Sequence, residues 1–290
     1  MFNSIKKVIN DSVSHRKLGM LRNLRYRLAY PPPLYAKIAE NLVLVLGCQR
    51  SGNTLTYLML NAHPSIQGID ESDVGYKFPK RNCLKVKGKE ETLIALKFPT
   101  QTARIDYVFD YLSSAKIIWP SRNPYAVVSS MLRWKEQKGN WITVYARDEL
   151  WQHSFLFPEI NDIELGSLDD VSLGAYVWKY KERVLQLCKQ SEVATFTFEY
   201  ESLLDKPRQI MTEIIEFIGL EWDESVLNHQ DQYSPGKRYP GGTDGSKALD
   251  RSRKNPELCL TERDIEIITH VCAEGMTVHG YRSPSQTERQ

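Results

Sequence analysis

The feature that most constrains this chain of 290 residues is a glycine-bounded turn between an apolar strand and an apolar helix. Residues 42–47 form a short apolar run of the kind found in buried strands, and residues 55–60 continue as an apolar helix. Such a turn presents backbone N–H groups and the positive end of the helix dipole to one anion. The sequence therefore predicts a phosphate-binding loop, and a tight turn without a ligand is the alternative. The loop reads Gly47-Cys48-Gln49-Arg50-Ser51-Gly52-Asn53-Thr54.

The spacing of this loop is that of a P-loop, in which two glycines enclose four residues, but one residue differs. Asn53 stands where a nucleotide triphosphatase has the lysine that reaches the β- and γ-phosphates. Arg50 instead supplies positive charge from within the loop, which suits a terminal phosphate that is not cleaved. The loop therefore counts against ATP or GTP hydrolysis.

Further apolar runs separated by helical patterns predict the fold class. Strands are expected at residues 66–69, 92–98, 115–119 and 193–198, and helices at residues 172–190, 207–219 and 261–275. Strands that alternate with helices, without an internal repeat, indicate a three-layer α/β/α domain with a mostly parallel central sheet. Two long segments, 134–166 and 228–256, fit this scheme poorly and are expected to be lids, binding loops or surface excursions.

The charge is uneven along the chain, which helps to divide it. With 41% hydrophobic and 26% charged residues, the composition suits one globular domain, expected at residues 41–282 and followed by a polar tail at 283–290. Residues 1–40 hold eight Lys or Arg against two acids and include the Pro31-Pro32-Pro33 run. They predict a basic helical extension and linker that is either solvated or in peripheral contact with an anionic membrane. No nucleic-acid partner is expected.

Neither a membrane span nor a metal site is predicted. No stretch approaches about 18 apolar residues, and the first residues lack the apolar core of a signal peptide, so a cytoplasmic location is expected. The five cysteines are scattered without a CxxC pair, which indicates buried thiols rather than disulfides or zinc ligands.

A second motif points to a second phosphate. The strand at 115–119 leads into Pro120-Ser121-Arg122-Asn123-Pro124, and a helix carrying Ser130 follows. Ligands of open α/β sheets bind at the carboxyl ends of strands, where Arg122 is expected, and Ser130 lies two helical turns onward. Together Arg122 and Ser130 suit a phosphate separate from the first, although a helix-starting turn alone would also explain Arg-Asn-Pro.

These motifs resemble those of sulfotransferases that use 3′-phosphoadenosine 5′-phosphosulfate (PAPS). The loop at 49–54 resembles their Arg-Ser-Gly-Thr-Thr loop, and residues 116–124 with Ser130 resemble their 3′-phosphate element. Residues 198–203 resemble a segment whose tyrosine, here Tyr200, borders the adenine, and residues 279–281 resemble the family's closing Leu-Gly-Tyr. The likeness spans residues 41–282 and implies the P-loop-like sulfotransferase fold, PAPS as co-substrate and no metal. It implies that the donor is bound by Arg50, Ser51, Gly52, Asn53, Thr54, Arg122, Ser130 and Tyr200.

A late polar stretch, residues 241–254, resembles in composition the loop that folds over the nucleotide in this family. Its glycines would allow closure and its cations would meet phosphates. Ser246, Lys247 and Arg253 are the candidates here, and an ordinary solvated loop is the alternative for each.

In-line sulfuryl transfer needs a base for the acceptor proton, and Glu71 is the first candidate. In the protein-tyrosine sulfotransferases, the loop, Ala-His-Pro and Glu-Glu-Thr follow one another as residues 50–72 do here, and their second glutamate falls on Glu71. Asp73 replaces an arginine that this branch uses near the acceptor, which implies a different acceptor. Asp70 is the neighbouring alternative base, and His153 is a further rival.

Lys97 is the second catalytic candidate, because a cation beside the phosphate loop would stabilise charge on the bridging oxygen as the sulfuryl group departs. It ends the strand at 92–98 and resembles the family's strand-end lysine. A lysine that extends from the sheet edge to solvent is the alternative.

Two other functions compete with sulfuryl transfer. A P-loop kinase or nucleotide hydrolase would need a lysine in the loop and an acidic metal ligand after a strand, whereas the strands here end near Lys97 and Arg122. A non-catalytic nucleotide-binding adaptor would leave Glu71 and Lys97 without a role. The acceptor is expected to be a carbohydrate or a small metabolite, and aromatic residues between 134 and 151 are candidates to stack on it.

Overall fold

The central element of the computed structural model is a parallel sheet of five strands, ordered β2-β3-β1-β4-β7. The structure describes residues 39–71, 92–136, 139–236, 238–239, 242–254 and 258–284. Every predicted strand is present, which confirms the α/β class. The strands are β1 (Leu42–Val45), β2 (Ile66–Ile69), β3 (Leu93–Lys97), β4 (Lys116–Ser121) and β7 (Thr195–Glu199).

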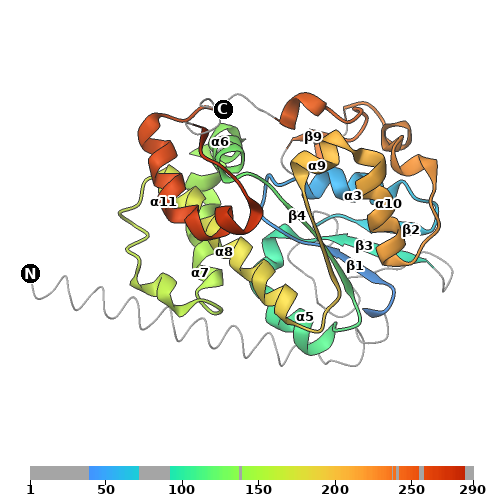
Figure 1. The fold of residues 1–290 in the computed structure, drawn as a ribbon, viewed down its shortest axis with the longest axis horizontal. Coiled ribbons are helices and arrows are strands. Elements are labelled where there is room, and N and C mark those ends of the chain that lie inside the picture. Colours follow the sequence, from blue (N-terminus) through green and yellow to red (C-terminus); the bar gives the residue numbers. More distant parts are fainter. Residues whose placement is uncertain are drawn as a thin grey trace, which may run out of the picture.

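Helices cover both faces of the sheet and make the three layers (Figure 1). Alternate residues of β1 face opposite sides, with Leu42 and Leu44 in one apolar cluster and Val43 and Val45 in the other. The first cluster includes α5 (Ile105–Tyr111), α6 (Pro124–Arg133), α7 (Arg147–His153), α8 (Asp170–Gln190) and α11 (Glu262–His279). The second includes α3 (Asn53–Asn61), α9 (Tyr200–Asp205) and α10 (Pro207–Ile218).

The predicted helices are confirmed, but α11 extends one turn beyond the expected end near Gly275. This glycine lies inside the helix, where an added Cβ would be 2.7 Å from the ring of Trp178 in α8. The helix ends instead at Gly280, whose φ is 68°. Gly275 therefore serves close packing between two helices and not termination.

The aromatic segment at 134–166 packs against the core. After the short strands β5 (Lys135–Glu136) and β6 (Gly139–Asn140), a π-helical turn at Ile142–Ala146 leads into α7, and a 3₁₀ turn follows at Pro158–Asp162. Trp141 and Leu150 are buried in the same cluster as α8. The segment is therefore part of the domain core and not a free lid.

The segment at 228–256 contains two short strands, β8 (Arg238–Tyr239) and β9 (Thr243–Asp244). It also forms 3₁₀ turns at His229–Gln232 and Arg251–Lys254. Two more such turns lie outside it, Glu224–Val226 directly before the segment and Pro99–Arg104 before α5.

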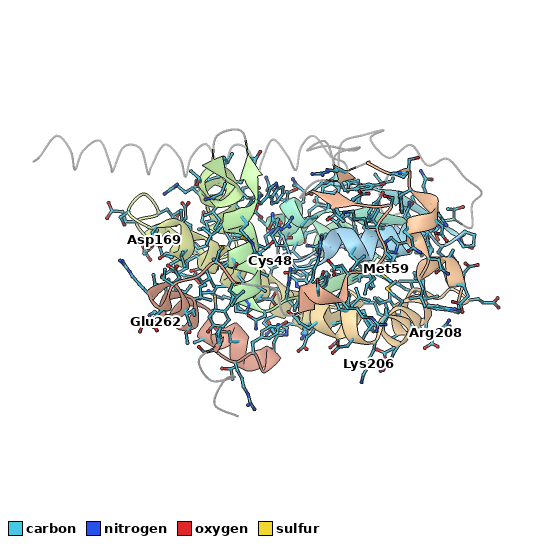
Figure 2. The ribbon with its side chains drawn as sticks, turned by 90° about the horizontal axis from the view of Figure 1, so that it is seen from above. Cys48, Met59, Asp169, Lys206, Arg208 and Glu262 are labelled. Carbon is cyan, nitrogen blue, oxygen red and sulfur yellow. The ribbon has the colours of Figure 1, made fainter. Side chains whose placement is uncertain are left out.

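Some sequence predictions lie outside the described residues, namely those on the basic extension at 1–38, on Asp73, on Cys83 and on the tail beyond residue 284. Within the described ranges, no helix has the length and apolarity that a bilayer span requires. Cys48, Cys188 and Cys272 are buried thiols, as predicted, whereas Cys259 is exposed. Viewed from above, Cys48 lies near the middle of the molecule (Figure 2).

Candidate active site

The predicted phosphate loop joins β1 to α3, and its backbone adopts left-handed conformations that the sequence allows. Gly52 caps α3 with φ of 97°, and Arg50, with φ of 69°, is the non-glycine residue with a positive φ in the described part of the chain. A Cβ at Gly52 would lie 2.3 Å from the ring of Tyr200. One at Gly47, with φ of 132°, would lie 3.1 Å from the carbonyl oxygen of Pro120. Both glycines are therefore required by conformation and by close approach.

Asn53, in the position of the P-loop lysine, braces the loop from within. Its Nδ2 donates to the carbonyl oxygen of Cys48 at 2.7 Å. Ser51 is fully buried, and its Oγ has no hydrogen-bond partner among the described residues. The loop thus holds an unused hydroxyl beside the start of α3, where a bound anion would be placed.

Three arginines come together at the phosphate loop, where all of them line the same cavity. Arg50 Nε donates to Ser130 Oγ at 2.9 Å, and Arg122 donates to the carbonyl oxygens of Arg50 at 2.9 Å and of Arg253 at 3.0 Å. Burial, followed by repulsion from Arg122 and Arg253, lowers the pKa of Arg50 to about 10. Burial is also the main cause that lowers the pKa of Arg122. The cluster, which we call the arginine cluster (Arg50, Arg122 and Arg253), is a strong attractor for anions.

Aromatic residues fix the orientation of these arginines. The guanidinium of Arg122 lies 4.5 Å from the ring centre of Tyr200, and that of Arg50 lies 5.0 Å from the ring of Trp134. Trp178 in α8 donates its Nε1 hydrogen to the carbonyl oxygen of Arg122 at 2.9 Å. Arg122 is largely buried, and its Nε has no hydrogen-bond partner within the described ranges, so a donor remains for a ligand.

A second charged group lies where β2 and β3 end. Lys97, only 1% exposed, is 2.7 Å from Asp70 and 3.8 Å from Glu71, and its Nζ donates to Thr54 Oγ1 at 3.3 Å. Lys97 therefore connects the carboxylates to the phosphate loop. The alternative of a lysine extending to solvent is wrong, because the whole side chain is buried.

The two neighbouring carboxylates differ in access. Asp70 is 1% exposed and engaged with Lys97, whereas Glu71 is 18% exposed and lines the cavity. Glu71 Oε2 accepts a hydrogen bond from Thr100 Oγ1 at 2.9 Å. Burial raises the pKa of Glu71 above its ordinary value and outweighs Lys97 and Thr100, which lower it. Glu71 is therefore the carboxylate that combines access with proton affinity, as a general base requires.

His153, the other candidate base, is buried in α7 away from the cavity. Its Nδ1 lies 2.8 Å from the carbonyl oxygen of Glu149. Burial, with the nearby charge of Lys181, lowers the pKa of His153 to about 4. The side chain is therefore held neutral inside the fold.

One cavity of about 400 Å³ brings the two charged groups together, a volume within the usual range of ligand sites. Of the predicted residues, Ser51, Ser130 and Ser246 do not line it: Ser51 is fully buried within the loop, Ser130 accepts a hydrogen bond from Arg50, and Ser246 donates to Asp244 at 2.7 Å. The predicted residues that line it are Arg50, Gly52, Asn53, Thr54, Glu71, Lys97, Arg122, Tyr200, Lys247 and Arg253. In the described ranges, no three His, Cys, Asp or Glu side chains group as metal ligands would.

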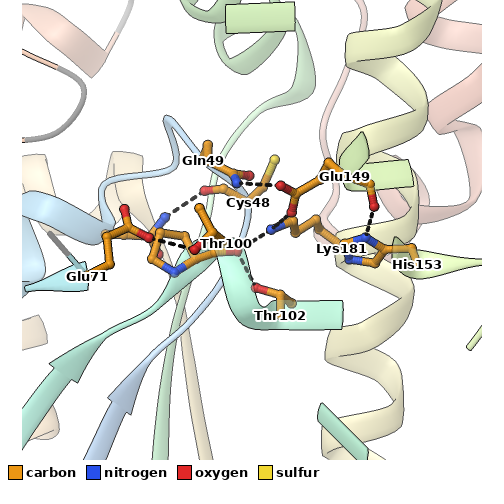
Figure 3. A network of polar contacts seen from close by, with 10 residues as sticks. Cys48, Gln49, Glu71, Thr100, Thr102, Glu149, His153 and Lys181 are labelled. Carbon is orange, nitrogen blue, oxygen red and sulfur yellow. Dashed lines mark hydrogen bonds and ion pairs between the residues drawn. The ribbon is translucent and has the colours of Figure 1, made fainter. Parts of the chain in front are cut away.

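The sequence reasoning missed several residues around this cavity. Gln49, His229 and Arg238 also line it, and so does Trp134, one of the aromatic residues expected to stack on the acceptor. Behind the loop, Lys181 of α8 and Glu149 of α7 form a buried ion pair of 2.5 Å (Figure 3). Helical spacing did contain a signal for this pair, because Lys181 lies on the apolar face of α8, four residues after Val177 and three before Val184.

Comparison with known proteins places this chain in a family. A model described as the sulfotransferase family matches residues 75–224, which is more than half of the chain. Protein-tyrosine sulfotransferase 2 of Gallus gallus is 25% identical over 232 residues, covering 73% of this chain and 58% of that protein. The chain thus spans less than two thirds of that relative's length.

Two solved structures are similar at lower identity. A sulfotransferase domain from the curacin biosynthetic pathway has a TM-score of 0.55 at 17% identity, covering 83% of this chain and 98% of that domain. The sulfotransferase domain of the Synechococcus PCC 7002 olefin synthase has a TM-score of 0.48 at 19% identity, covering 79% of this chain and 93% of that domain. The curacin domain agrees with the parallel sheet described above. The chain belongs to the sulfotransferase family.

Proposed function

We propose that this protein transfers a sulfuryl group from PAPS to a hydroxyl or amine of its acceptor, with Glu71 as the base and Lys97 stabilising the leaving group. One observation carries this proposal: a cavity joins the phosphate loop and the arginine cluster to an accessible carboxylate that lies 3.8 Å from a buried lysine. In-line transfer needs these two groups side by side, one to take a proton and one to meet negative charge.

The residues of the loop fit the donor. The orphaned hydroxyl of Ser51 and the backbone at the start of α3 suit the 5′ end, together with Gly52, Asn53 and Thr54. Arg122, with its free Nε, and Ser130 suit the separate 3′-phosphate, and Tyr200 lies against Arg122 where the adenine would border it. Mutual repulsion within the arginine cluster would be relieved by either phosphate. Lys247 and Arg253 line the same cavity from the late segment.

The chain's own residues divide the chemical work. When bound, PAPS supplies the sulfuryl group and a phosphate leaving group. Glu71 accepts the acceptor's proton at its carboxylate, which burial makes a stronger base than an ordinary glutamate. Lys97 holds its charge beside Thr54 of the loop, and Asp70 fixes its direction through the ion pair of 2.7 Å. Asp70 is thus a positioning residue and not a rival base.

The acceptor is proposed to be a carbohydrate or a small metabolite. Trp134 lines the cavity beside Arg50. Its ring stacks on that of the buried Trp141, with ring centres 6.3 Å apart, so the cavity has an aromatic surface that is packed from behind. Sugar and aromatic rings both stack on such a surface. A panel of glycans, small alcohols and tyrosine peptides, each assayed with PAPS, tests this. Turnover of the peptides alone would overturn it.

The donor is tested first by calorimetric titration with adenosine 3′,5′-bisphosphate, run beside ATP with magnesium. The proposal expects micromolar binding of the bisphosphate and little response to ATP. Tight binding of ATP with magnesium and none of the bisphosphate would instead support a P-loop kinase or hydrolase.

The role of Glu71 is tested by Glu71→Gln, which keeps the shape but removes the base. We expect kcat to fall by about 10²–10⁴-fold, the usual contribution of a general base, while bisphosphate affinity stays within about twofold. The matched control is Glu159→Gln, at an exposed glutamate outside the cavity, which should leave kcat unchanged. Full activity of Glu71→Gln would show that another group takes the proton.

A further inference from the structure

A buried ion pair contacts both parts of the site from behind. Glu149 and Lys181 are 7% and 0% exposed, and their carboxylate and ammonium groups are 2.5 Å apart. Glu149 Oε2 accepts a hydrogen bond from Gln49 Nε2 at 3.2 Å, and Lys181 Nζ donates to the carbonyl oxygen of Pro99. Figure 3 shows these contacts running from Gln49 through the ion pair to the Pro99–Thr100 turn, whose Thr100 in turn donates to Glu71 at the end of β2.

The two ends of this chain are adjacent to residues that matter for catalysis. Gln49 lines the cavity and precedes Arg50 in the phosphate loop. Thr100 follows Pro99 and donates to Glu71 at 2.9 Å. The pair therefore connects the loop expected to bind the donor with the turn that holds the base.

Stability alone does not account for such a pair. Transferring two charges into the interior costs several kcal/mol each, and well-packed apolar residues of similar volume often give equal or better stability. Apolar residues could not make these directed contacts. The Glu149 carboxylate accepts a hydrogen bond from Gln49 and pairs with Lys181, and Lys181 also donates to the Pro99 carbonyl oxygen. A carboxylate only accepts hydrogen bonds and an ammonium only donates them, so the donor and acceptor of the Gln49–Glu149 and Lys181–Pro99 bonds cannot be exchanged.

We propose that Glu149 and Lys181 are positioning residues for sulfuryl transfer, which hold the phosphate loop and the Pro99–Thr100 turn in a fixed relation so that Glu71 faces the donor site. The proposal rests on the function above for the role of Glu71. It concerns geometry transmitted through Gln49 and Thr100, since neither member of the pair lines the cavity.

The proton affinity of Glu71 reports this geometry directly. The charged groups that act on Glu71 are Lys97, Asp70 and Lys181, and Thr100 adds a hydrogen bond. Burial raises the pKa of Glu71, and Lys97, Thr100 and Lys181 lower it. Release of the Pro99–Thr100 turn would remove part of the lowering, so the pKa of Glu71 would rise further.

The test uses the double variant Glu149→Gln/Lys181→Met, which removes both charges together and leaves neither buried unpaired. The Glu71 carboxyl is titrated by ¹³C NMR in the nucleotide-free protein, and its resonance is assigned by its loss in Glu71→Gln. We expect a higher Glu71 pKa in the double variant and in Thr100→Val. The double variant also removes the direct effect of the Lys181 charge, but the part of its shift that passes through the Thr100 hydrogen bond is already lost in Thr100→Val. We therefore expect a shift smaller than the sum when the two are combined.

The control is the exposed pair Glu159–Arg183, whose arginine lies on the same helix α8. Glu159→Gln/Arg183→Met makes the same chemical change there and should leave the titration of Glu71 unmoved. If the buried variant fails to fold, Glu149→Asp keeps the charge but shortens the reach, and we expect a shift of the Glu71 pKa in the same direction.

Kinetics with PAPS provide the second readout. We expect kcat of the buried double variant to fall about tenfold to hundredfold, with KM for PAPS within about twofold and the acid limb of the rate profile moved to higher pH. An unchanged Glu71 pKa in the folded variant, or full additivity with Thr100→Val, overturns the proposal. The titration needs no turnover, so failure of the unaltered protein to use PAPS would count against the proposed function alone.

Discussion

At the scale of the residue, Gly52 shows how one position carries several requirements of the site. Gly52 is the N-cap of α3 with φ of 97°, and the Tyr200 ring occupies the space that a side chain at residue 52 would need. Tyr200 in turn lies against Arg122. The contact therefore places the residues predicted for the adenine and the 3′-phosphate relative to the loop predicted for the 5′ end.

Gly52→Ala is expected to damage binding more than folding. The left-handed backbone costs about 1–2 kcal/mol for a residue with a Cβ, and the added methyl must displace the Tyr200 ring. We expect affinity for adenosine 3′,5′-bisphosphate to fall at least about tenfold, measured by calorimetry. Gly166→Ala is the control, because no atom lies within 4 Å of its added Cβ and its φ is not positive. Equal affinity of the Gly52 and Gly166 variants would refute the argument.

The sequence favoured Glu71 over Asp70 only through a family resemblance, and its own pattern did not separate the two. Both carboxylates follow β2, and either could have faced the ligand. The structure separates them by burial, since Lys97 pairs closely with Asp70 and leaves Glu71 to the cavity. Sequence spacing brings residues to one edge of a sheet, but burial of each side chain depends on packing across the fold.

At the scale of the element, the strands were predictable and the packing between helices was not. The strands are buried on both faces by helices, so their apolar runs are continuous and bounded by polar turns. Gly275, by contrast, reads as a helix end because glycine is common there. Only the approach of Trp178 explains why the helix continues through it.

Gly275→Ala tests this packing. Alanine in a helix interior normally gains about 0.5–1 kcal/mol over glycine. Here the Cβ would lie 2.7 Å from the fully buried ring of Trp178, and overpacking of this kind costs about 1–3 kcal/mol, so we expect a net loss in urea unfolding. Bisphosphate affinity should also fall, because Trp178 supports the Arg122 carbonyl. Thr277→Ala, at an exposed position of α11, is the control and should change stability by less than about 0.5 kcal/mol. A Gly275→Ala variant more stable than the unaltered protein would show that the Trp178 ring moves away from the added Cβ at little cost in free energy.

The aromatic segment at 134–166 illustrates the same limit. Its tryptophans and tyrosines suit a ligand-binding lid as well as a core, and periodicity does not separate the two. The structure divides them, since Trp134 lines the cavity while Trp141 is buried beside α8. Glu149 escaped notice because its partner is distant in sequence.

At the scale of the whole molecule, His153 sets a limit on acid stability. Burial keeps its pKa near 4 in the folded state, against 6.5 as the ordinary value. The unfolded chain therefore binds a proton first as the pH falls, and stability present above pH 6.5 is lost between pH 6.5 and 4. A difference of 2.5 units (6.5 − 4) corresponds to at most about 3 kcal/mol.

His153→Asn is expected to reduce the loss of stability as the pH falls, because asparagine does not titrate and can still donate to the Glu149 carbonyl. The free energy of unfolding in urea, measured at pH 7 and pH 5, should differ less in the variant than in the unaltered protein. His270→Asn, at an exposed histidine of α11, is the control and should retain the original difference. An equal difference in both variants would mean that carboxylates govern the acid limit.

The contact between Arg122 and the carbonyl oxygen of Arg253 spans 131 positions of the chain. During synthesis the sheet strands, which end with β7 at Glu199, leave the ribosome well before Arg253 does. A nascent chain can therefore complete its sheet while the arginine cluster still lacks its last member and the late wall of the cavity. The cavity is thereby completed only after the sheet, when most of the domain has been made.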